Sequence, residues 1–572
     1  MKAYFQISSL SFILLASIII CNCTAHPDST CGTFELWNLL HCATAYVSTR
    51  LICSTLQRRQ LETAITTAIA IMCLYQAGLG TIQLCSNFTT AGITGSFGNS
   101  GIYGGFLAVS ASMTAVWLMV HHTHRHRCPQ QILRCLTAVP LTTALFLIPI
   151  TMSRAAILSL ATVTIVFTIK TPGIRRLLRI KYAFTGKRRP AIICTLIFLT
   201  VAASVFIYRI KKDSADGRIF MSRICIEEIC RKPLSGAGAG RFLAAYGESM
   251  RKHFQSGHYT DRERMTADCP EYPFNTFLCI GVEYGIPAML LLFIGAVSVI
   301  TYQIRCNSPL GYGLLALSVF AIFSYPQEIM FFRILASTLA ATGFEQEHRH
   351  TGAIRLVYGA LILVFATGIA IESDAIRPKQ TATEEWQRYI TAYQPQTYAL
   401  IASKGARFLH DMEHDHHFLF QYGQALLETE QYEKADSILQ LGASISCDPM
   451  FWNLIGQCRQ ARGKYEEAGK CYVLAFGTLP NRLYPLYLLA QLYNEEEDRR
   501  KLYMMYDYIK SFIPKKESET TMRLREEVSD MVLQQTSVQD TVFTGITKVN
   551  VVPTPSVEST ISFPWCSSVT ME

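Results

Sequence analysis

Long apolar segments recur along residues 1–371, and short polar stretches separate them. A helix needs about 20 mostly apolar residues to cross the hydrocarbon core of a bilayer, and this criterion predicts about eleven membrane-spanning helices. Their centres lie near Leu15, Ala45, Ile69, Ser110, Leu141, Thr162, Phe198, Phe293, Leu317, Leu335 and Leu361. The second segment is the least regular, because His41, Thr44 and Arg50 interrupt it. The pattern predicts an all-α, polytopic membrane domain.

The composition divides the chain into two bodies. Of the 572 residues, 50% are hydrophobic and 17% are charged, whereas soluble domains usually carry about 25% charged residues. No Asp or Glu occurs between Glu62 and Asp213, but the composition after residue 372 is that of a soluble protein. We expect four regions: a membrane domain at 1–371, a linker and helix at 372–410, helical repeats with a capping helix at 411–535, and a disordered tail at 536–572.

Positive charge gathers at residues 170–189, between two of the predicted helices. The run comprises Lys170, Arg175, Arg176, Arg179, Lys181, Lys187, Arg188 and Arg189. Basic loops of this kind stay on the cytoplasmic side, which places the N-terminus inside and both the 210–273 loop and the C-terminal domain outside. The net charge of +9 is also compatible with nucleic-acid binding. The position of the charge favours membrane orientation, and we expect no nucleic-acid partner.

Residues 411–514 follow a different period. With Gly456 taken as the fixed glycine of a helix-turn-helix repeat, large and small residues fall on the tetratricopeptide pattern. The matching residues are Trp452, Ile455, Gly463, Tyr465, Ala468, Tyr472, Ala475 and Pro480, then Leu419, Tyr422, Gly423, Tyr432 and Ala435 one repeat earlier, and Leu486, Leu489, Ala490, Tyr506 and Pro514 one repeat later. Three stacked repeats suffice to bury a shared core. We predict an α-solenoid whose groove binds a protein partner, or which stabilises the membrane domain.

The 19 cysteines are scattered along the chain. Several lie in apolar segments, where a thiol acts as a small hydrophobic group: Cys73, Cys135, Cys194 and Cys279. Their spacing forms no Cys/His metal motif, and we expect no metal site. Cys225 and Cys230 fall in the predicted outer loop, and the sequence leaves their pairing open.

Three segments carry polar or flexible groups at unusual places. Arg154 heads an apolar segment, either as a snorkelling anchor or as the partner of an anion. Glu283 lies within an apolar segment, where a carboxylate marks a functional site or a hydrogen bond between helices. Residues 233–242, Pro-Leu-Ser-Gly-Ala-Gly-Ala-Gly-Arg-Phe, have alternating glycines that permit tight turns. No strand pattern precedes them, so we exclude a nucleotide-binding loop.

Taken in order, these segments resemble the O-antigen ligase and polymerase family. Its members have a Gly/Asn-rich motif, a Ser-Arg-Ala/Gly motif that opens a later span, and a periplasmic loop with an Arg. A Pro-Leu-x-Gly-x-Gly-x-x-x-Phe motif and an Asn-x-x-Leu-x-x-x-x-Glu-x-Gly segment follow. The corresponding positions are residues 95–101, residues 153–156, Arg218, residues 233–242, and Asn275, Leu278, Glu283 and Gly285. The resemblance covers most of residues 60–345, and some members also carry tetratricopeptide repeats.

The resemblance implies a glycosyltransferase of the bacterial inner membrane that works without a metal or other cofactor. Arg154 and Arg218 would be the catalytic residues and would bind the diphosphate of an undecaprenyl-diphosphate-linked glycan. A guanidinium group can form two parallel hydrogen bonds to phosphate oxygens. The substrate would also be contacted by Asn99, Arg241, Asn275 and Glu283.

The resemblance does not identify a general base. Many members have a His directly before the Asn of the last motif, where this chain has Phe274. A base is needed to orient the attacking hydroxyl. His253, His258 and Glu271 are the candidates, and a solvated loop residue is the alternative for each.

The acceptor distinguishes three variants of the same chemistry. A ligase would use lipid A core or a similar periplasmic acceptor, a polymerase would use a second lipid-linked chain, and a protein O-oligosaccharyltransferase would use a protein. A membrane transporter or a non-catalytic repeat scaffold is the alternative from another class. No internal repeat is visible in the apolar segments, and both arginines are predicted at one face, which favours chemistry at the surface over transport.

Overall fold

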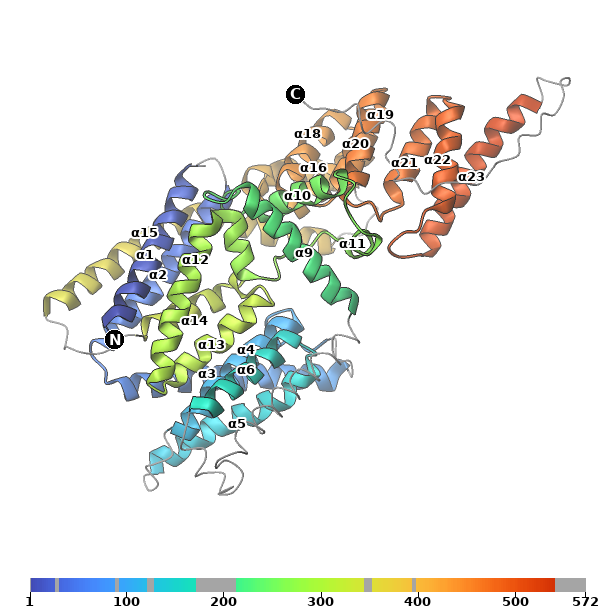
Figure 1. The fold of residues 1–572 in the computed structure, drawn as a ribbon. Coiled ribbons are helices and arrows are strands. Elements are labelled where there is room, and N and C mark those ends of the chain that lie inside the picture. The colour runs from blue at the N-terminus through green and yellow to red at the C-terminus, as the bar shows by residue number, and fades with distance from the viewer. Residues whose placement is uncertain are drawn as a thin grey trace, which may run out of the picture. The chain divides into compact units, whose positions relative to one another are not determined.

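The computed structural model describes residues 2–25, 30–87, 92–120, 128–170, 212–343, 352–392 and 398–540 (Figure 1). Every regular element in these ranges is a helix, as the sequence predicts. The chain divides into two compact units. The first comprises Met1–Arg218, Ile229–Phe242 and Glu271–Arg377, and the second comprises Ile219–Glu228, Leu243–Pro270 and Pro378–Glu572.

The first unit contains the apolar helices. They are α1 (Lys2–Ala25), α2 (Thr30–Cys53), α3 (Arg58–Asn87), α4 (Ser100–Val120), α5 (Cys128–Ile150), α6 (Arg154–Lys170), α12 (Thr276–Arg305), α13 (Pro309–Ile322), the short η2 (Pro326–Glu328), α14 (Met330–Ala341) and the start of α15 (Gly352–Ala392). All predicted span centres lie in these helices except Phe198, which is outside the described residues. Most of the basic run at 170–189 is also outside them.

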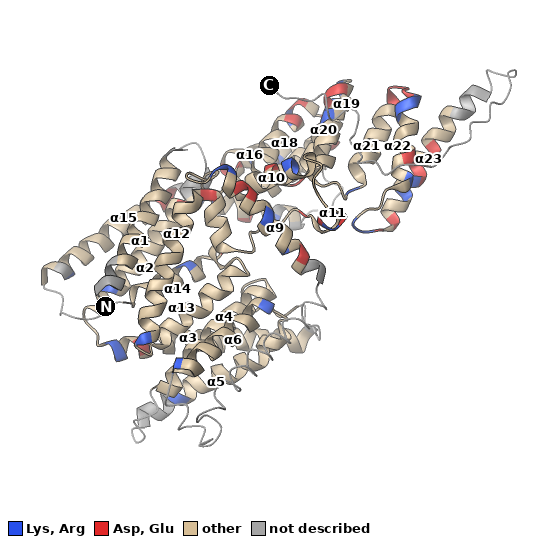
Figure 2. Cartoon of the chain, viewed as in Figure 1, with Lys and Arg blue, Asp and Glu red and all other residues tan. Residues whose placement is uncertain are grey.

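Within the described residues, five helices are long and apolar enough to cross a membrane: Ile7–Thr24, Arg58–Ser86, Ser100–Val120, Thr276–Arg305 and Arg355–Asp374. Helices α13 and α14 are apolar but have 14 and 12 residues, fewer than the about 20 of a full crossing. Charged side chains are sparse over the apolar helices and frequent over the C-terminal helices (Figure 2). The protein is therefore an integral membrane protein, and the count of eleven spans remains a prediction.

Helix α4 lies inside the first unit because it is apolar on all sides. Most residues of the apolar part of Ser100–Val120 are buried, and the helix packs against α3, α5, α6 and α13. Gly104 permits close approach to α6, since a Cβ there would lie 2.7 Å from the Thr151 hydroxyl oxygen. The glycines at the start of α4 therefore position the first turn of α6, which Arg154 begins.

Helix α12 is interrupted at Gly285, whose φ of 84° and ψ of 177° are not helical. In a continuous helix, the carbonyls of Val282 and Glu283 would accept hydrogen bonds from the N–H groups of residues 286 and 287. Pro287 has no N–H, and the N–H of Ile286 points to another partner. Backbone groups in an apolar environment cost several kcal/mol when they are unsatisfied. Both carbonyls therefore need donors from elsewhere in the chain.

Residues 233–240, which we call the bridging loop, supply these partners. Three hydrogen bonds join the loop to α12: Ala237 N to Val282 O at 2.8 Å, Gly238 N to Glu283 O at 3.0 Å, and Ile286 N to Pro233 O at 2.8 Å. Gly236 allows the close approach, because a Cβ there would lie 2.3 Å from the Glu283 carbonyl oxygen. The glycine-rich motif and the break in α12 thus satisfy each other's backbone groups.

Asn22 of α1 fixes the other side of the bridging loop. Its side-chain amide donates to the carbonyl of Ser235 at 3.2 Å, and its side-chain oxygen accepts from the N–H of Ala239 at 2.9 Å. Next to it, Cys23 packs in a small apolar cluster with Ala239 and with residues of α12. Hydrogen bonds and apolar packing therefore join the end of α1, the bridging loop and the break in α12.

The second unit combines part of the outer loop with the C-terminal helices. It contains the middle of α9 (Lys212–Arg231), nearly all of α10 (Phe242–Gln255), α11 (Asp261–Thr266) and the end of α15. The C-terminal helices are α16 (Tyr398–Met412), α17 (His416–Glu428), α18 (Tyr432–Ile445), α19 (Met450–Ala461), α20 (Tyr465–Thr478), α21 (Tyr484–Glu495), α22 (Arg499–Ser511) and α23 (Glu519–Asp540). Helix α23 extends five residues into the region predicted as a disordered tail, and the remainder of that tail is outside the described residues.

The C-terminal helices form regular pairs. Helices α17, α19 and α21 begin 34 residues apart, and each packs against the helix that follows it. The predicted fixed glycines lie where the paired helices touch. A Cβ at Gly423 would lie 2.5 Å from the Leu439 side chain, and a Cβ at Gly456 would lie 2.3 Å from the ring of Tyr472. Small residues therefore set the distance between paired helices.

The bridging loop yields a prediction with a matched control in the first unit. Gly236 and Gly98 have nearly the same backbone, with φ of 68° and 69°, but a Cβ at Gly98 would meet nothing within 4 Å. We expect Gly98→Ala to cost only the left-handed backbone strain of about 1–2 kcal/mol. Gly236→Ala should cost about 1–3 kcal/mol more, because the methyl group collides with α12.

The measurement is the thermal unfolding midpoint of the purified protein in detergent. Equal midpoints for the two variants would show that the bridging loop does not hold α12.

Candidate functional site

Arg154 and Arg218 come together in the first unit, although they lie 64 positions apart in the sequence. Arg154 begins α6, Arg218 lies on α9, and both side chains are half-buried. Burial, and then the positive charge of Arg154, lower the pKa of Arg218 to about 10. Arg218 therefore keeps its charge at neutral pH, and the two guanidinium groups are near enough to repel each other. An anion that binds both groups would relieve this repulsion.

Two neighbouring groups hold Arg218 in place. Its Nη1 donates to the carbonyl of Phe323 at 2.8 Å, at the C-terminal end of α13, where unpaired carbonyls attract a cation. Its guanidinium carbon lies 4.3 Å from the centre of the Phe274 ring. This distance gives a cation–π contact, worth about 0.5–2 kcal/mol. Phe274, which the sequence marks only as a departure from the family pattern, is therefore the platform for Arg218.

The platform is part of an aromatic cluster that sequence reasoning missed. The rings of Phe274 and Tyr325 meet edge to face, with centroids 5.4 Å apart. Tyr272 stacks on Tyr325 at 4.7 Å and is 40% exposed. The spacing of Tyr272 and Phe274 in the sequence could have revealed this cluster, because residues two apart in an extended segment point to the same side.

Asn99 lies beside the start of α6. Its side-chain oxygen accepts from the N–H of Gly101 at 2.8 Å and of Ile102 at 3.3 Å, so it caps α4. The hydroxyl of Ser153 donates to the carbonyl of Gly101 at 3.2 Å. The structure thus joins the Gly/Asn-rich motif to the Ser-Arg motif, and Asn99 remains exposed.

The loop before α4 is fastened to α3 by two glutamines that the sequence analysis did not single out. Gln76 bonds to Ser96 through both its amide nitrogen and its oxygen, at 2.6 and 3.0 Å. Gln83 accepts from the N–H groups of Thr94 and Gly95 at 2.9 and 2.8 Å. The two glutamines lie seven residues apart, on one face of an apolar helix, and that spacing could have revealed them.

Asn275 and Glu283 bond to the protein backbone. Asn275 caps α12 by accepting from the N–H groups of Phe277 and Leu278 at 2.9 and 3.1 Å. Glu283 is buried, and its carboxylate accepts a hydrogen bond from the N–H of Phe242. Asn275 therefore holds the start of α12, and Glu283 holds the residue that follows Arg241. Arg241, which directly follows the bridging loop, is exposed.

A half-buried ion pair lies near Glu283. Arg333 of α14 forms a bidentate ion pair with Glu35 of α2, with N–O distances of 2.9 and 3.0 Å. The pair joins two apolar helices and satisfies charges that would otherwise be costly there. The sequence analysis did not pair these residues, because they lie 298 positions apart.

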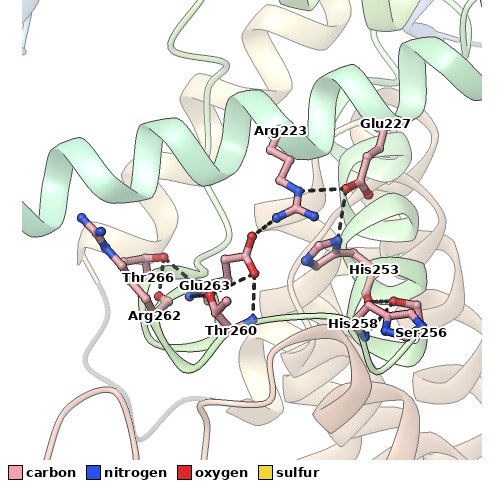
Figure 3. A network of polar contacts seen from close by, with 9 residues as sticks. All are labelled: Arg223, Glu227, His253, Ser256, His258, Thr260, Arg262, Glu263 and Thr266. Atoms are coloured by element: carbon pink, nitrogen blue, oxygen red, sulfur yellow. Dashed lines mark hydrogen bonds and ion pairs between the residues drawn. The ribbon is translucent and has the colours of Figure 1, made fainter.

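The three candidate bases fall in different surroundings. His253 and His258 belong to the second unit, and Glu271 belongs to the first. His253 is 5% exposed, and its Nδ1 lies 3.2 Å from the carboxylate of Glu227. Arg223 bonds to the same carboxylate and also to Glu263, so His253 is part of an ion-pair network among α9, α10 and α11 (Figure 3).

Glu271 is exposed and directly precedes the aromatic cluster. Burial, followed by the negative charge of Glu271, raises the pKa of Tyr272. Glu271 is therefore the candidate base that the structure places beside the rings around Arg218. His258 is exposed, and its backbone N–H donates to Ser256 at 3.3 Å.

The two outer-loop cysteines lie on one helix. Cys225 and Cys230 are five residues apart on α9, with Cys225 buried and Cys230 exposed. Residues at this spacing point to different sides of a helix, so these two cysteines do not form a disulfide.

Residues 139–293 match the family model described as O-Antigen ligase. The matched range includes Arg154, Arg218, the bridging loop and the break in α12, whereas Asn99 lies before it. No curated protein matches the chain. This part of the chain is similar to O-antigen ligases, which supports a glycosyltransferase function of the ligase or polymerase type and a lipid-linked glycan as substrate.

The contact between Arg218 and Phe274 predicts a pH-dependent loss of stability for Phe274→His. An imidazolium beside Arg218 is disfavoured in the folded state, so the introduced histidine should have a folded pKa below the unfolded value of about 6.5. The penalty should therefore appear as the pH falls through about 6.5, at about 1.4 kcal/mol per unit of pKa difference.

Thermal midpoints at pH 8 and pH 5.5 test this expectation. Phe274→Leu is the control, because it removes the ring without adding a titratable group. If the difference between the two variants is the same at both pH values, Arg218 does not lie over residue 274.

Proposed function

We propose that this protein transfers a glycan from undecaprenyl diphosphate to an acceptor at the outer face of the bacterial inner membrane. The convergence of Arg154 and Arg218 in one unit is the main support for this proposal. The match of residues 139–293 to O-antigen ligases adds independent support. In this orientation the outer loop and the C-terminal domain face the periplasm.

The two arginines would bind the diphosphate and stabilise it as it leaves. An acceptor hydroxyl attacks the anomeric carbon, the bond from that carbon to the diphosphate oxygen breaks, and the electron pair stays on the diphosphate. Guanidinium groups that are fixed before the reaction stabilise this charge without reorganisation. Phe274 and the carbonyl of Phe323 hold Arg218 in its place.

Glu271 is the base that we favour among the three candidates. It belongs to the same compact unit as the two arginines, whereas His253 and His258 belong to the other unit. In this role Glu271 would accept the proton of the attacking hydroxyl. Asn99, Arg241, Asn275 and Glu283 remain proposed substrate contacts, and the capping bonds of Asn99 and Asn275 leave part of each amide for this purpose.

We further propose that the paired C-terminal helices are tetratricopeptide repeats. The 34-residue interval between α17, α19 and α21 and the glycines at the helix contacts support this assignment. Their groove would bind a protein partner in the periplasm.

Arg218→Lys should reduce glycan transfer by about 100-fold or more, the usual effect of removing one aligned donor to a developing negative charge. An ammonium group keeps the charge but cannot form two parallel bonds to phosphate oxygens. The measurement is transfer of glycan from the undecaprenyl-diphosphate donor by membranes that contain equal amounts of each variant.

Arg231→Lys, an exposed position in the last turn of the same helix, is the matched control and should keep wild-type activity. Full transfer by Arg218→Lys at normal protein level would overturn the proposed site.

Deletion of the gene should distinguish the possible acceptors, with surface glycans examined by gel electrophoresis. A ligase predicts loss of all long and short chains from the lipid anchor. If single-unit caps survive on that anchor, the protein is a polymerase, and if lipid-anchored glycans are unchanged while glycoproteins disappear, its acceptor is a protein.

A further inference from the structure

Two cysteines from distant parts of the chain meet in the second unit. Cys269 follows α11 in the outer loop, and Cys447 lies between α18 and α19. The thiol of Cys269 donates to the carbonyl of Cys447 at 3.0 Å. The thiol of Cys447 in turn lies 3.8 Å from the carbonyl of Pro270. Each thiol therefore points to the backbone of the other segment, although 178 positions separate the two residues.

Polar contacts fix the outer-loop segment directly before this meeting point. Asp268 bonds to Lys515 at 2.8 Å and to Arg482 at 3.3 Å. The side-chain amide of Asn481 donates to the carbonyl of Ala267 at 2.9 Å. Because charge-assisted bonds and a buried amide hold residues 267–268, the neighbouring Cys269 has little freedom to move away from Cys447.

The packing of α10 fixes Cys447 in the same way. A Cβ at Gly247 would lie 2.8 Å from both the Cα and the Cβ of Cys447, so only glycine permits this contact. Cys447 is buried, and Cys269 is half-buried. The pair is thus enclosed by the outer loop and by the C-terminal helices of the same unit.

We propose that Cys269 and Cys447 form a disulfide that ties the outer loop to the C-terminal helices. The two thiols lose two protons and two electrons as the S–S bond forms. A disulfide-bearing oxidoreductase of the exported compartment accepts the electrons and becomes a dithiol. The proposal depends on an outward placement of both segments, since disulfides persist in oxidising compartments. It does not depend on glycan transfer.

The environment of the pair also indicates when the bond forms. The hydrogen bond with the Cys447 thiol, together with burial, raises the pKa of Cys269 well above its usual value. Thiolates carry out disulfide exchange, so the folded protein would exchange slowly. Oxidation therefore precedes the final packing of the loop, and the finished bond resists reductants that do not unfold the protein.

Mass spectrometry of the full-length protein tests the proposal. Cells are quenched in acid, free thiols are alkylated under denaturing conditions, and the protein purified from membranes is digested without reduction. We expect most chains to give one linked species that contains the peptides of Cys269 and Cys447. We expect dithiothreitol to release these peptides in urea but not in native detergent solution.

Variants sharpen the test. Cys269→Ser should leave Cys447 alkylated, and Cys447→Ser should do the same to Cys269. Cys225→Ser is the control, because Cys225 is a buried thiol of the same unit, and its loss should leave the linked species unchanged. If Cys269→Ser or Cys447→Ser fails to accumulate, the presence or absence of the linked species in the wild-type protein still decides the proposal.

Alkylation of both thiols in most wild-type chains, or linkage of either to another cysteine, would overturn the proposal. Glycan transfer is measured on the same membranes. A wild-type protein with free thiols that still transfers glycan would refute only the disulfide, and a linked protein without transfer would refute only the transferase.

Discussion

The first unit depends on satisfying the backbone groups that the break in α12 leaves without partners. Gly285 and Pro287 remove two helical hydrogen bonds in the middle of an apolar helix, and the bridging loop replaces them with bonds of its own. The same loop directly follows α9, and the segment that carries Phe274 directly precedes α12. The hydrogen bonds at the break in α12 therefore anchor both α9, which carries Arg218, and the segment that carries Phe274. They also explain why the glycine-rich motif and the Glu-x-Gly motif occur together in one chain.

The arginine site is held in a state that is unfavourable without a ligand. Two like charges lie near each other, partly out of water, with one of them fixed between an aromatic ring and a helix carbonyl. Such an arrangement costs free energy in the empty protein, and the surrounding helices must supply it. In the proposed function, a diphosphate would recover part of this cost on binding and more of it as its charge grows. The unfavourable empty state is therefore consistent with stabilisation of a leaving group rather than with a simple anchor in the lipid headgroups.

Features that repeat along the chain could be predicted from the sequence, whereas contacts between distant residues could not. Apolar segments of helical length located the described helices, and Gly423 and Gly456 marked the contacts between paired helices. The ordered motifs also identified Arg154 and Arg218 from a resemblance. Nothing in the sequence indicates that Gly236 faces the carbonyl of Glu283, or that Cys269 meets Cys447, because composition and spacing carry no information on backbone partners far along the chain. Cys225 and Cys230 were close in sequence, yet one helix keeps them apart.

Phe274 changes the proton chemistry of the site as well as its packing. An aromatic ring holds Arg218 without adding charge, whereas an ionised imidazole at this position would oppose both guanidinium groups. The ring cannot accept a proton, so in the proposed reaction the attacking hydroxyl would lose its proton elsewhere. Among the three candidate bases, Glu271 is the one in the same unit. A carboxylate is a weaker base than imidazole. A carboxylate would suffice as the base if the bond to the diphosphate is largely broken before the proton moves. A hydroxyl that has begun to bond to an oxocarbenium-like carbon is much more acidic than a free hydroxyl. In the proposed mechanism, strong stabilisation of the leaving group by the two arginines would therefore make a weak base sufficient.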